Sequence, residues 1–260
     1  MRIYVGGIGL HVERAGKGRP LILLHGLGGN VDSIRPDFDH FSRLHDVVAL
    51  DCRGHGLSDK PVHYTLDDHV ADVLAVVDAL NIAEFSVVGS SAGSYIAQGL
   101  GISAGRRIHK LALVVPKAHG TGSSSARFLD EHAEEVKGLT TDQQVRFMRE
   151  HLLAPTTEEH RTAILRERER TSGYVLTDAE REAANRALRN FDFRPELPKI
   201  TASTLVISGK YDPLNPPEFG GELATLIPDC RFELFEKSGH LPRFEEREHY
   251  LRVLGAFLES

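Results

Sequence analysis

The stretch "VVGSSAGSY" spans residues 87–95 and places three serines and two glycines directly after apolar residues. A nucleophile on a sharp strand-to-helix turn follows the pattern Gly-x-Ser-x-Gly, because its backbone is strained and its neighbours must be small. Only one frame fits, with Gly89 and Gly93 around Ser91; the other two serines have no glycine two residues away on either side. The stretch therefore predicts Ser91 as a nucleophile. The alternative is that residues 89–93 form a Gly/Ser turn that binds a phosphate or nothing at all.

The surrounding sequence predicts a sheet that is buried on both faces. Six Val-, Ile- and Leu-rich runs bounded by Gly or Pro indicate strands, at 21–26, 46–51, 85–90, 110–116, 203–209 and 231–236. Helical spacing between them, as in 65–82 with Thr65 and Asp68 near a capping box, favours parallel strands with crossover helices. "RIYVGGIGLHVER" predicts an antiparallel edge pair with a Gly6-Gly7 turn. We expect an α/β fold with a mostly parallel, doubly wound sheet of about eight strands.

Residues 117–197 contain no convincing strand and are charged and helical in pattern. Three capping boxes mark predicted helix starts: Thr141 with Gln144, Thr156 with Glu159, and Thr177 with Glu180. Because this block follows a strand, it would lie over the carboxyl ends of the sheet, where sites form. We expect a helical cap inserted into a core of 1–116 and 198–260; a peripheral decoration is the alternative.

A serine hydroxyl needs a base, and the base needs an acid to orient it. Asp212 lies in "GKYDPLNP", just past the strand at 203–209, and His240 lies in "EKSGHLPRFEE", after the last strand. Gly239 would permit a tight loop at the histidine. Ser91, Asp212 and His240 all follow strand ends and can therefore meet at one edge of the sheet, which singles out this histidine among fourteen.

The tetrahedral intermediate of acyl transfer also needs hydrogen-bond donors for its oxyanion. "LLHGLGGN" supplies a Gly-rich loop after the first buried strand, and we expect the backbone N–H groups of Leu27 and Ala92 to be the donors. His25 is expected to support this loop through hydrogen bonds rather than to act as a base. "DCRGHGLSDKP" is expected to form a structural turn, although Arg53, His55 and Asp59 could mimic a site.

With these motifs in this order, the chain resembles the capped members of the α/β-hydrolase superfamily. The resemblance covers 1–116 and about 198–260, and rests on "HGLGG", "DCRGHGLSD", "GSSAG", "GKYDPLNP" and "SGHLPRFEE". It implies that Ser91 is the nucleophile, that His240 is the general base and then acid, and that Asp212 orients His240. It implies no metal and no organic cofactor.

The reaction class follows from the nucleophile. Dehalogenases and epoxide hydrolases of this superfamily use aspartate at the elbow, whereas serine suits attack on a carboxylic ester, lactone or thioester. A carboxylic ester hydrolase is the first expectation. A carbon–carbon bond hydrolase of ring-cleavage products has the same triad, but some of its members carry an aromatic after the histidine, where this chain has Leu241. A hydrolase-fold ligand receptor is the third possibility.

The cap carries two further sets of candidates. Carbon–carbon cleavage would favour a fixed cation in the cap facing the triad, but Arg127, Arg146 and Arg149 lie in helices whose pattern indicates solvated faces. Five side chains could line a pocket or equally pack the cap helices together: Phe128, Phe147, Met148, Phe191 and Phe193.

Composition limits the partners and the compartment. The chain has 260 residues and a net charge of −6 with scattered Lys and Arg, which argues against nucleic acid or an acidic membrane as a partner. Cys52 and Cys230 are the only cysteines, and neither a signal peptide nor a run of membrane-spanning length is apparent. We expect a cytoplasmic protein that acts on a small-molecule ester or lactone; the oligomeric state stays open.

Overall fold

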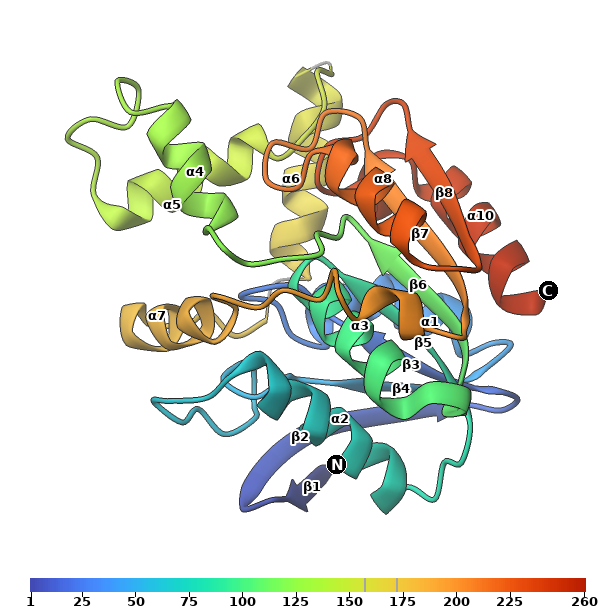
Figure 1. The fold of residues 1–260 in the computed structure, drawn as a ribbon. Helices are drawn as coiled ribbons and strands as arrows, with labels where there is room; N and C mark the ends of the chain where they lie inside the picture. Colours follow the sequence, from blue (N-terminus) through green and yellow to red (C-terminus); the bar gives the residue numbers. More distant parts are fainter. Residues whose placement is uncertain (157, 172) are drawn as a thin grey trace.

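The structure, a computed structural model, describes residues 1–156, 158–171 and 173–260, which form an eight-stranded sheet with helices on both faces (Figure 1). The strands lie in the order β1-β2-β4-β3-β5-β6-β7-β8. Their bounds are β1 Arg2–Val5, β2 Ile8–Gly16, β3 Pro20–Leu24, β4 Asp46–Leu50, β5 Phe85–Ser90, β6 Ile108–Val114, β7 Ser203–Gly209 and β8 Cys230–Phe235. Pairing is antiparallel from β1 to β4 and parallel from β4 to β8. The predicted α/β fold with a mostly parallel sheet is confirmed.

The edge pair at the N-terminus forms as predicted. Val5 pairs with Ile8, and the two residues between them make the turn. Gly6 and Gly7 have φ values of 53° and 81°, in the region that residues with a side chain rarely adopt. The two glycines therefore set the position of the hairpin.

Successive residues of the central strands pack on opposite faces, as a doubly wound sheet requires. Ile22 and Leu24 join a cluster with α2 (Leu66–Ala79), α3 (Ala92–Ala104) and α8 (Pro217–Leu226). Leu21 and Leu23 join a second cluster with α1 (Arg35–Phe41) and α10 (Arg247–Glu259). Both faces are covered, which explains why the strand sequences are apolar throughout.

The segment between β6 and β7 is helical. Its described residues form α4 (Ser124–Glu131), α5 (Thr141–His151), α6 (Glu158–Arg170) and α7 (Asp178–Ala187). Within that described part the only β pairing is an isolated bridge between His119 and Asp192. Figure 1 shows the four helices gathered on one side of the sheet, with α6 and α7 nearer to it than α4 and α5.

Two predicted capping boxes are present in full, those of Thr65 with Asp68 and Thr177 with Glu180. In each, the threonine oxygen accepts the N–H three residues on, and the carboxylate accepts the N–H of the threonine. The box predicted at Thr156 and Glu159 adjoins residue 157, which is outside the described residues.

The predicted N-cap residue of α5 is wrong by one position. Thr140, rather than Thr141, accepts the N–H of Gln143 at 3.3 Å, and Oε1 of Gln143 accepts the N–H of Thr140 at 2.8 Å. The sequence "TTDQQ" contains two Thr-x-x-Gln frames one residue apart. Thr140 has the extended backbone of a cap residue, and Thr141 is already the first residue of the helix.

No helix in the described part of the chain combines the length and apolar character needed to cross a membrane. The same residues hold no group of three His, Cys, Asp or Glu side chains arranged to bind a metal ion. Cys52 and Cys230 are both free thiols.

Candidate active site

Ser91 occupies the sharp turn between β5 and α3. Its φ and ψ are 52° and −119°, a strained conformation for a residue with a side chain. α3 begins at Ala92, earlier than the sequence "SYIAQGL" suggested, so the whole turn is made at Ser91. The N–H and hydroxyl of Ser94 both donate to the carbonyl of Ser91, at 2.8 Å and 2.6 Å, and brace the turn.

The two glycines of the elbow are required by close approach of the backbone. A Cβ at Gly89 would lie 2.2 Å from the carbonyl oxygen of Gly93, where the helix passes over the strand. A Cβ at Gly93 would lie 2.4 Å from the carbonyl oxygen of Leu24 in the neighbouring strand. Neither distance is possible for a real side chain, which is the steric reason for the Gly-x-Ser-x-Gly spacing.

The three residues predicted to act together lie in one hydrogen-bonded chain. Oγ of Ser91 is 3.0 Å from Nε2 of His240, and Nδ1 of His240 is 2.7 Å from Oδ2 of Asp212. Both His240 and Asp212 are buried. Because a carboxylate only accepts, Nδ1 carries the proton and donates it to Asp212, which leaves Nε2 free to accept the hydroxyl proton of Ser91.

Asp212 is held by groups that the sequence reasoning did not identify. Its Oδ1 accepts the backbone N–H groups of Leu214 at 2.9 Å and Asn215 at 3.0 Å. The buried amide of Asn215 donates in turn to the hydroxyl of Tyr95 and to the carbonyl of Val115. The acid loop is thereby tied to α3 and to the end of β6, and Oδ2 of Asp212 remains available for His240.

The loop of His240 is organised by Glu245, another residue missed in the sequence. Its carboxylate accepts the N–H groups of Gly239 (2.9 Å to Oε2), Leu241 (3.1 Å) and Ala154 (2.7 Å). Burial raises the pKa of this carboxyl, and the three N–H bonds oppose the rise. Ala154 lies beyond the end of α5, so Glu245 joins the helical segment to the histidine loop.

Gly239 is needed in that loop for a different reason from the one expected. It lies outside the positive-φ region, so the turn itself does not require glycine. A Cβ there would instead lie 2.2 Å from the carbonyl oxygen of Leu152, which also accepts the N–H of His240 at 2.7 Å. The helical segment therefore packs directly on the backbone of the catalytic candidate.

The loop that carries Leu27, one expected oxyanion donor, lies against Ser91, and Ala92, the other, follows Ser91 in the chain. A Cβ at Gly26, next to Leu27, would lie 3.3 Å from Cβ of Ser91. The N–H of Leu27 donates to no acceptor among the described residues, and Ala92, as the first residue of α3, has no intrahelical partner for its N–H. Both groups are thus available to an oxygen atom near Ser91.

His25 supports the loop as predicted. The N–H of Cys52 donates to Nε2 of His25 at 3.0 Å, so the ring proton lies on Nδ1 and is donated to the carbonyl of Gly26 at 2.8 Å. Burial lowers the pKa of His25 to about 4. The neutral ring thus ties β4 to the loop that follows β3.

The "DCRGHGLSDKP" segment forms the expected structural turn. Asp51 accepts the N–H groups of Val31 and Leu57, each at 2.7 Å. Arg53 makes a bidentate ion pair with Asp72 of α2, at 2.6 and 2.8 Å. Asp51 thus holds the backbone of the turn, and Arg53 joins the turn to α2.

The cap aromatics pack mostly against one another or on the core. Phe128 and Phe147 form a cluster with His132 and His151, with ring centroids between 4.1 and 6.0 Å apart. Phe191 lies against Tyr95 at 5.1 Å. This arrangement supports the packing alternative for these rings.

The profile of the alpha/beta hydrolase fold family matches residues 19–247. That match spans most of the chain, from β3 to the start of α10, and includes all three residues of the hydrogen-bonded chain. The protein belongs to the alpha/beta hydrolase fold family.

The names of similar proteins describe different activities. The chain is 26% identical to a proline iminopeptidase of Heyndrickxia coagulans, over 95% of this chain and 93% of that one. It is 25% identical to a 2-hydroxy-6-oxo-2,4-heptadienoate hydrolase of Pseudomonas putida, over 99% and 95%. The crystal structure of an enol-lactonase from Burkholderia xenovorans superposes with a TM-score of 0.86 at 26% identity, with full coverage of both chains.

Proposed function

We propose that this protein is a serine hydrolase that cleaves a carboxylic ester or lactone of a small molecule through an acyl-enzyme. The observation that carries the proposal is the chain of hydrogen bonds from Ser91 through His240 to the buried Asp212, at 3.0 and 2.7 Å. The strained elbow at Ser91 and the similarity to an enol-lactonase support it.

The chemistry needs only groups that the chain supplies. His240 takes the hydroxyl proton as Oγ of Ser91 attacks the ester carbonyl carbon, and the N–H groups of Leu27 and Ala92 bind the oxyanion. Collapse of the tetrahedral intermediate breaks the bond to the leaving oxygen, which receives the proton from His240. Water, deprotonated by His240, then attacks the acyl-enzyme, and the acid product leaves as Ser91 recovers its proton.

The proposed cap is the helical segment 117–197 over a core of 1–116 and 198–260. Contacts to both catalytic loops support this division: Leu152 accepts the N–H of His240, and Nη2 of Arg127 donates to the carbonyls of Pro213 and Leu214 beside Asp212. Arg127, whose exposed side chain also pairs with Glu131, thus holds the loop of Asp212 through hydrogen bonds that the sequence did not predict. We place the enzyme in the cytoplasm, since two free cysteines fit a reducing compartment.

Two other functions use the same fold. A carbon–carbon hydrolase of ring-cleavage products shares the triad, and the Pseudomonas putida relative is named as a hydrolase of a hydroxy-oxo-dienoate. A ligand receptor would keep the same side chains without turnover. The ester assignment is preferred because it needs no group beyond those described above.

The test compares three substrate classes side by side: short-chain para-nitrophenyl esters, a panel of lactones, and a ring-fission product. Hydrolysis of esters or lactones that is lost in Ser91→Ala supports the proposal. Fast turnover of the ring-fission product with negligible ester hydrolysis would establish the carbon–carbon reaction instead. Negligible turnover of all three, with tight binding of a small ligand, would indicate a receptor.

A further inference from the structure

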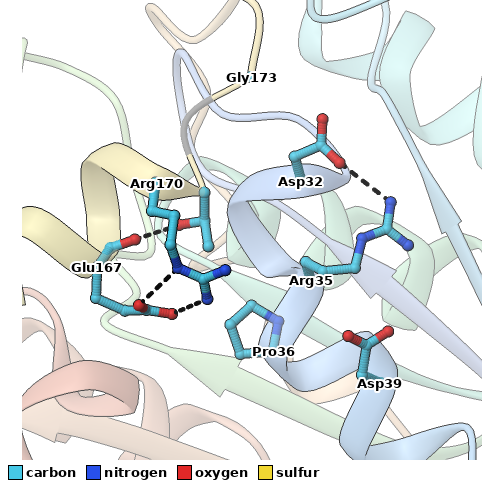
Figure 2. A pocket seen from close by; sticks show the side chains of 8 residues that line it. Asp32, Arg35, Pro36, Asp39, Glu167, Arg170 and Gly173 are labelled. Carbon is cyan, nitrogen blue, oxygen red and sulfur yellow. Dashed lines mark hydrogen bonds and ion pairs between the residues drawn. The ribbon is translucent and has the colours of Figure 1, made fainter.

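The arginines around the cavity between α1 and the end of α6 are already paired. Figure 2 shows this cavity, of about 310 Å³, with Arg170 bound to Glu167 and Arg35 bound to Asp32. The protein itself therefore neutralises both cations. A buried hydrogen-bond donor whose proton is not used lies elsewhere, next to Ser91.

This donor is the hydroxyl of Tyr95, on the first turn of α3 and four residues after Ser91. In a helix the Cα–Cβ bond tilts toward the N-terminus, so a side chain covers the turn that precedes it. The ring of Tyr95 is buried and packs against Phe191, with the centroids 5.1 Å apart. The side chain of Tyr95 is therefore directed back toward Ser91 and away from solvent.

The acid loop fixes the hydroxyl of Tyr95 from the other side. This hydroxyl accepts Nδ2–H of Asn215 at 2.9 Å, and the backbone N–H of Asn215 donates to Oδ1 of Asp212 at 3.0 Å. Asp212 is bound to His240, and His240 to Ser91, at 2.7 and 3.0 Å. Four hydrogen bonds thus lead from Tyr95 around to Ser91, while the same two residues are one helical turn apart. The hydroxyl of Tyr95 and Oγ of Ser91 are the two ends of this ring.

The end of β6 brings the same two groups together through separate bonds. The carbonyl of Val114 accepts the N–H of Ser91 at 2.9 Å, and the carbonyl of Val115 accepts Nδ2–H of Asn215 at 2.7 Å. Val115 has a φ of 47°, which is a strained value for a β-branched residue. The kink directs one carbonyl to the elbow and the next to the amide that holds Tyr95.

The phenol of Tyr95 is a donor and not a base. Burial raises the pKa of Tyr95, while its contacts with the side chains of Asn215 and Ser91 oppose the rise, so the phenol keeps its proton at neutral pH. Within the described residues the phenol oxygen accepts from Asn215, and its proton forms no hydrogen bond. Donors in free enzymes are often poorly aligned and form their hydrogen bond only as the reaction proceeds.

We propose that Tyr95 is a further catalytic residue, which donates a hydrogen bond to Oγ of Ser91 when negative charge develops on that atom. This inference rests on the proposed ester hydrolysis, and the step concerned is deacylation. His240 takes a proton from water as the water oxygen attacks the acyl carbon. The bond from that carbon to Oγ then breaks, its electron pair stays on Oγ, and His240 returns the proton to Oγ. Tyr95 keeps its own proton throughout and stabilises the charge on Oγ before it is protonated.

The two halves of the reaction depend on this donor to different degrees. When a para-nitrophenyl ester acylates Ser91, the leaving group is nitrophenolate, which is stable without a donor. In deacylation the leaving atom is Oγ itself. Loss of the donor should therefore slow deacylation much more than acylation.

The test follows nitrophenolate release from para-nitrophenyl acetate by stopped flow, which separates the acylation burst from the steady state. Tyr95→Phe keeps the ring and removes the donor. We expect its deacylation rate constant to fall at least about tenfold and its acylation rate constant to stay within about twofold, because a hydrogen bond to a charged group is lost in deacylation. Tyr64→Phe is the matched control, because the buried hydroxyl of Tyr64 has no partner among the described residues, and it should leave both constants at the wild-type value.

Two further variants separate donation to Oγ from an indirect effect on the acid loop. Ser124→Ala removes the donor to Oδ1 of Asn215, now at 3.0 Å, but leaves the hydroxyl of Tyr95 in place, so the ratio of the two rate constants should not change. A 3-fluorotyrosine at position 95 has nearly the shape of tyrosine and is a stronger donor, so it should raise the deacylation rate constant. This second probe retains the fold if Tyr95→Phe does not.

Three results would overturn the proposal. Equal loss of acylation and deacylation in Tyr95→Phe would mean that Tyr95 acts only by positioning Asp212, because His240 serves both steps. Unchanged constants in Tyr95→Phe, or no acceleration by 3-fluorotyrosine, would mean that no bond to Oγ is formed. Absence of ester hydrolysis in the wild-type protein would instead overturn the proposed function, and this inference with it.

Discussion

At the scale of single residues, the candidate site depends on the direction of hydrogen bonds. Oδ1 of Asp212 already accepts two backbone N–H groups, so only Oδ2 can serve His240. This division fixes the imidazole tautomer, because Nδ1 must donate and Nε2 must accept. The orientation of one carboxylate thus determines whether Ser91 has a base.

Replacement of Asp212 by Asn tests this dependence. The amide oxygen would keep the two N–H bonds of Leu214 and Asn215, and the NH₂ group would face Nδ1 of His240. His240 would then carry its proton on Nε2 and could not accept from Ser91, so we expect kcat to fall by about 10⁴ at neutral pH. Steady-state kinetics with an unchanged circular dichroism spectrum would check the result. A loss of less than tenfold would mean that Asp212 does not control the tautomer.

At the scale of elements, the histidine loop and the helical segment are built as one unit. The carbonyl of Leu152 accepts from His240, and Glu245 binds the N–H groups of Ala154 and Gly239 together. A shift of the helical segment would therefore move His240, so we expect this segment to influence catalysis.

Gly239→Ala is the matching prediction. The new Cβ would lie 2.2 Å from the carbonyl of Leu152, so either the loop or the cap must move. We expect a loss of stability on the order of 1–3 kcal/mol and a lower kcat, measured by urea unfolding and by ester hydrolysis. Gly255→Ala in α10 is the control, because a Cβ there meets nothing within 4 Å, and it should stabilise the protein by up to about 1 kcal/mol. Equal effects of the two substitutions would contradict the proposed coupling.

The same elements show how far the sequence could predict the structure. Apolar runs, the Gly6-Gly7 turn and the Thr65 and Thr177 caps are local patterns, and each produced the expected element. The predicted N-cap residue of α5 was wrong by one position because two equivalent Thr-x-x-Gln frames overlap. The sequence alone does not choose between them. As the elbow motif and the strand ends predicted, the side chains of His240 and Asp212 lie with that of Ser91.

What the sequence did not predict depends on contacts between distant segments. Glu245 looks like one of many surface carboxylates until Ala154, 91 residues away, is found to donate to it. Asn215 is similar, since its partners Tyr95 and Val115 are about a hundred residues distant.

At the scale of the whole molecule, three buried histidines link the oxyanion loop to the turn after β4 and to α2. The ring centroids of His25 and His55 are 5.1 Å apart, and those of His55 and His69 are 6.4 Å apart. Burial lowers the pKa of His25 to about 4 and that of His55 to about 3, and it lowers the pKa of His69 well below 6.5. All three rings are neutral in the folded protein at physiological pH.

These pKa shifts predict a loss of stability in mild acid. Between pH 6.5 and pH 4 the unfolded chain binds protons on the three histidines and the folded chain does not, so the free energy of unfolding falls as the pH falls. His25 alone contributes about 3 kcal/mol over this window. Urea unfolding should show a proton uptake by these three histidines that rises from below one at pH 7 to nearly three at pH 5. Stability that is constant over this range would mean that the histidines are charged in the folded state.

The central claim, that Ser91 is the nucleophile of an acyl-transfer enzyme, is tested most directly by covalent labelling. The protein is treated with an organophosphonate ester, and the modified peptide is sequenced by mass spectrometry. The account predicts one phosphonyl group on Ser91, retained in Ser90→Ala and absent in Ser91→Ala. Modification of Ser90, or no modification of the residues 87–95 at all, would contradict it.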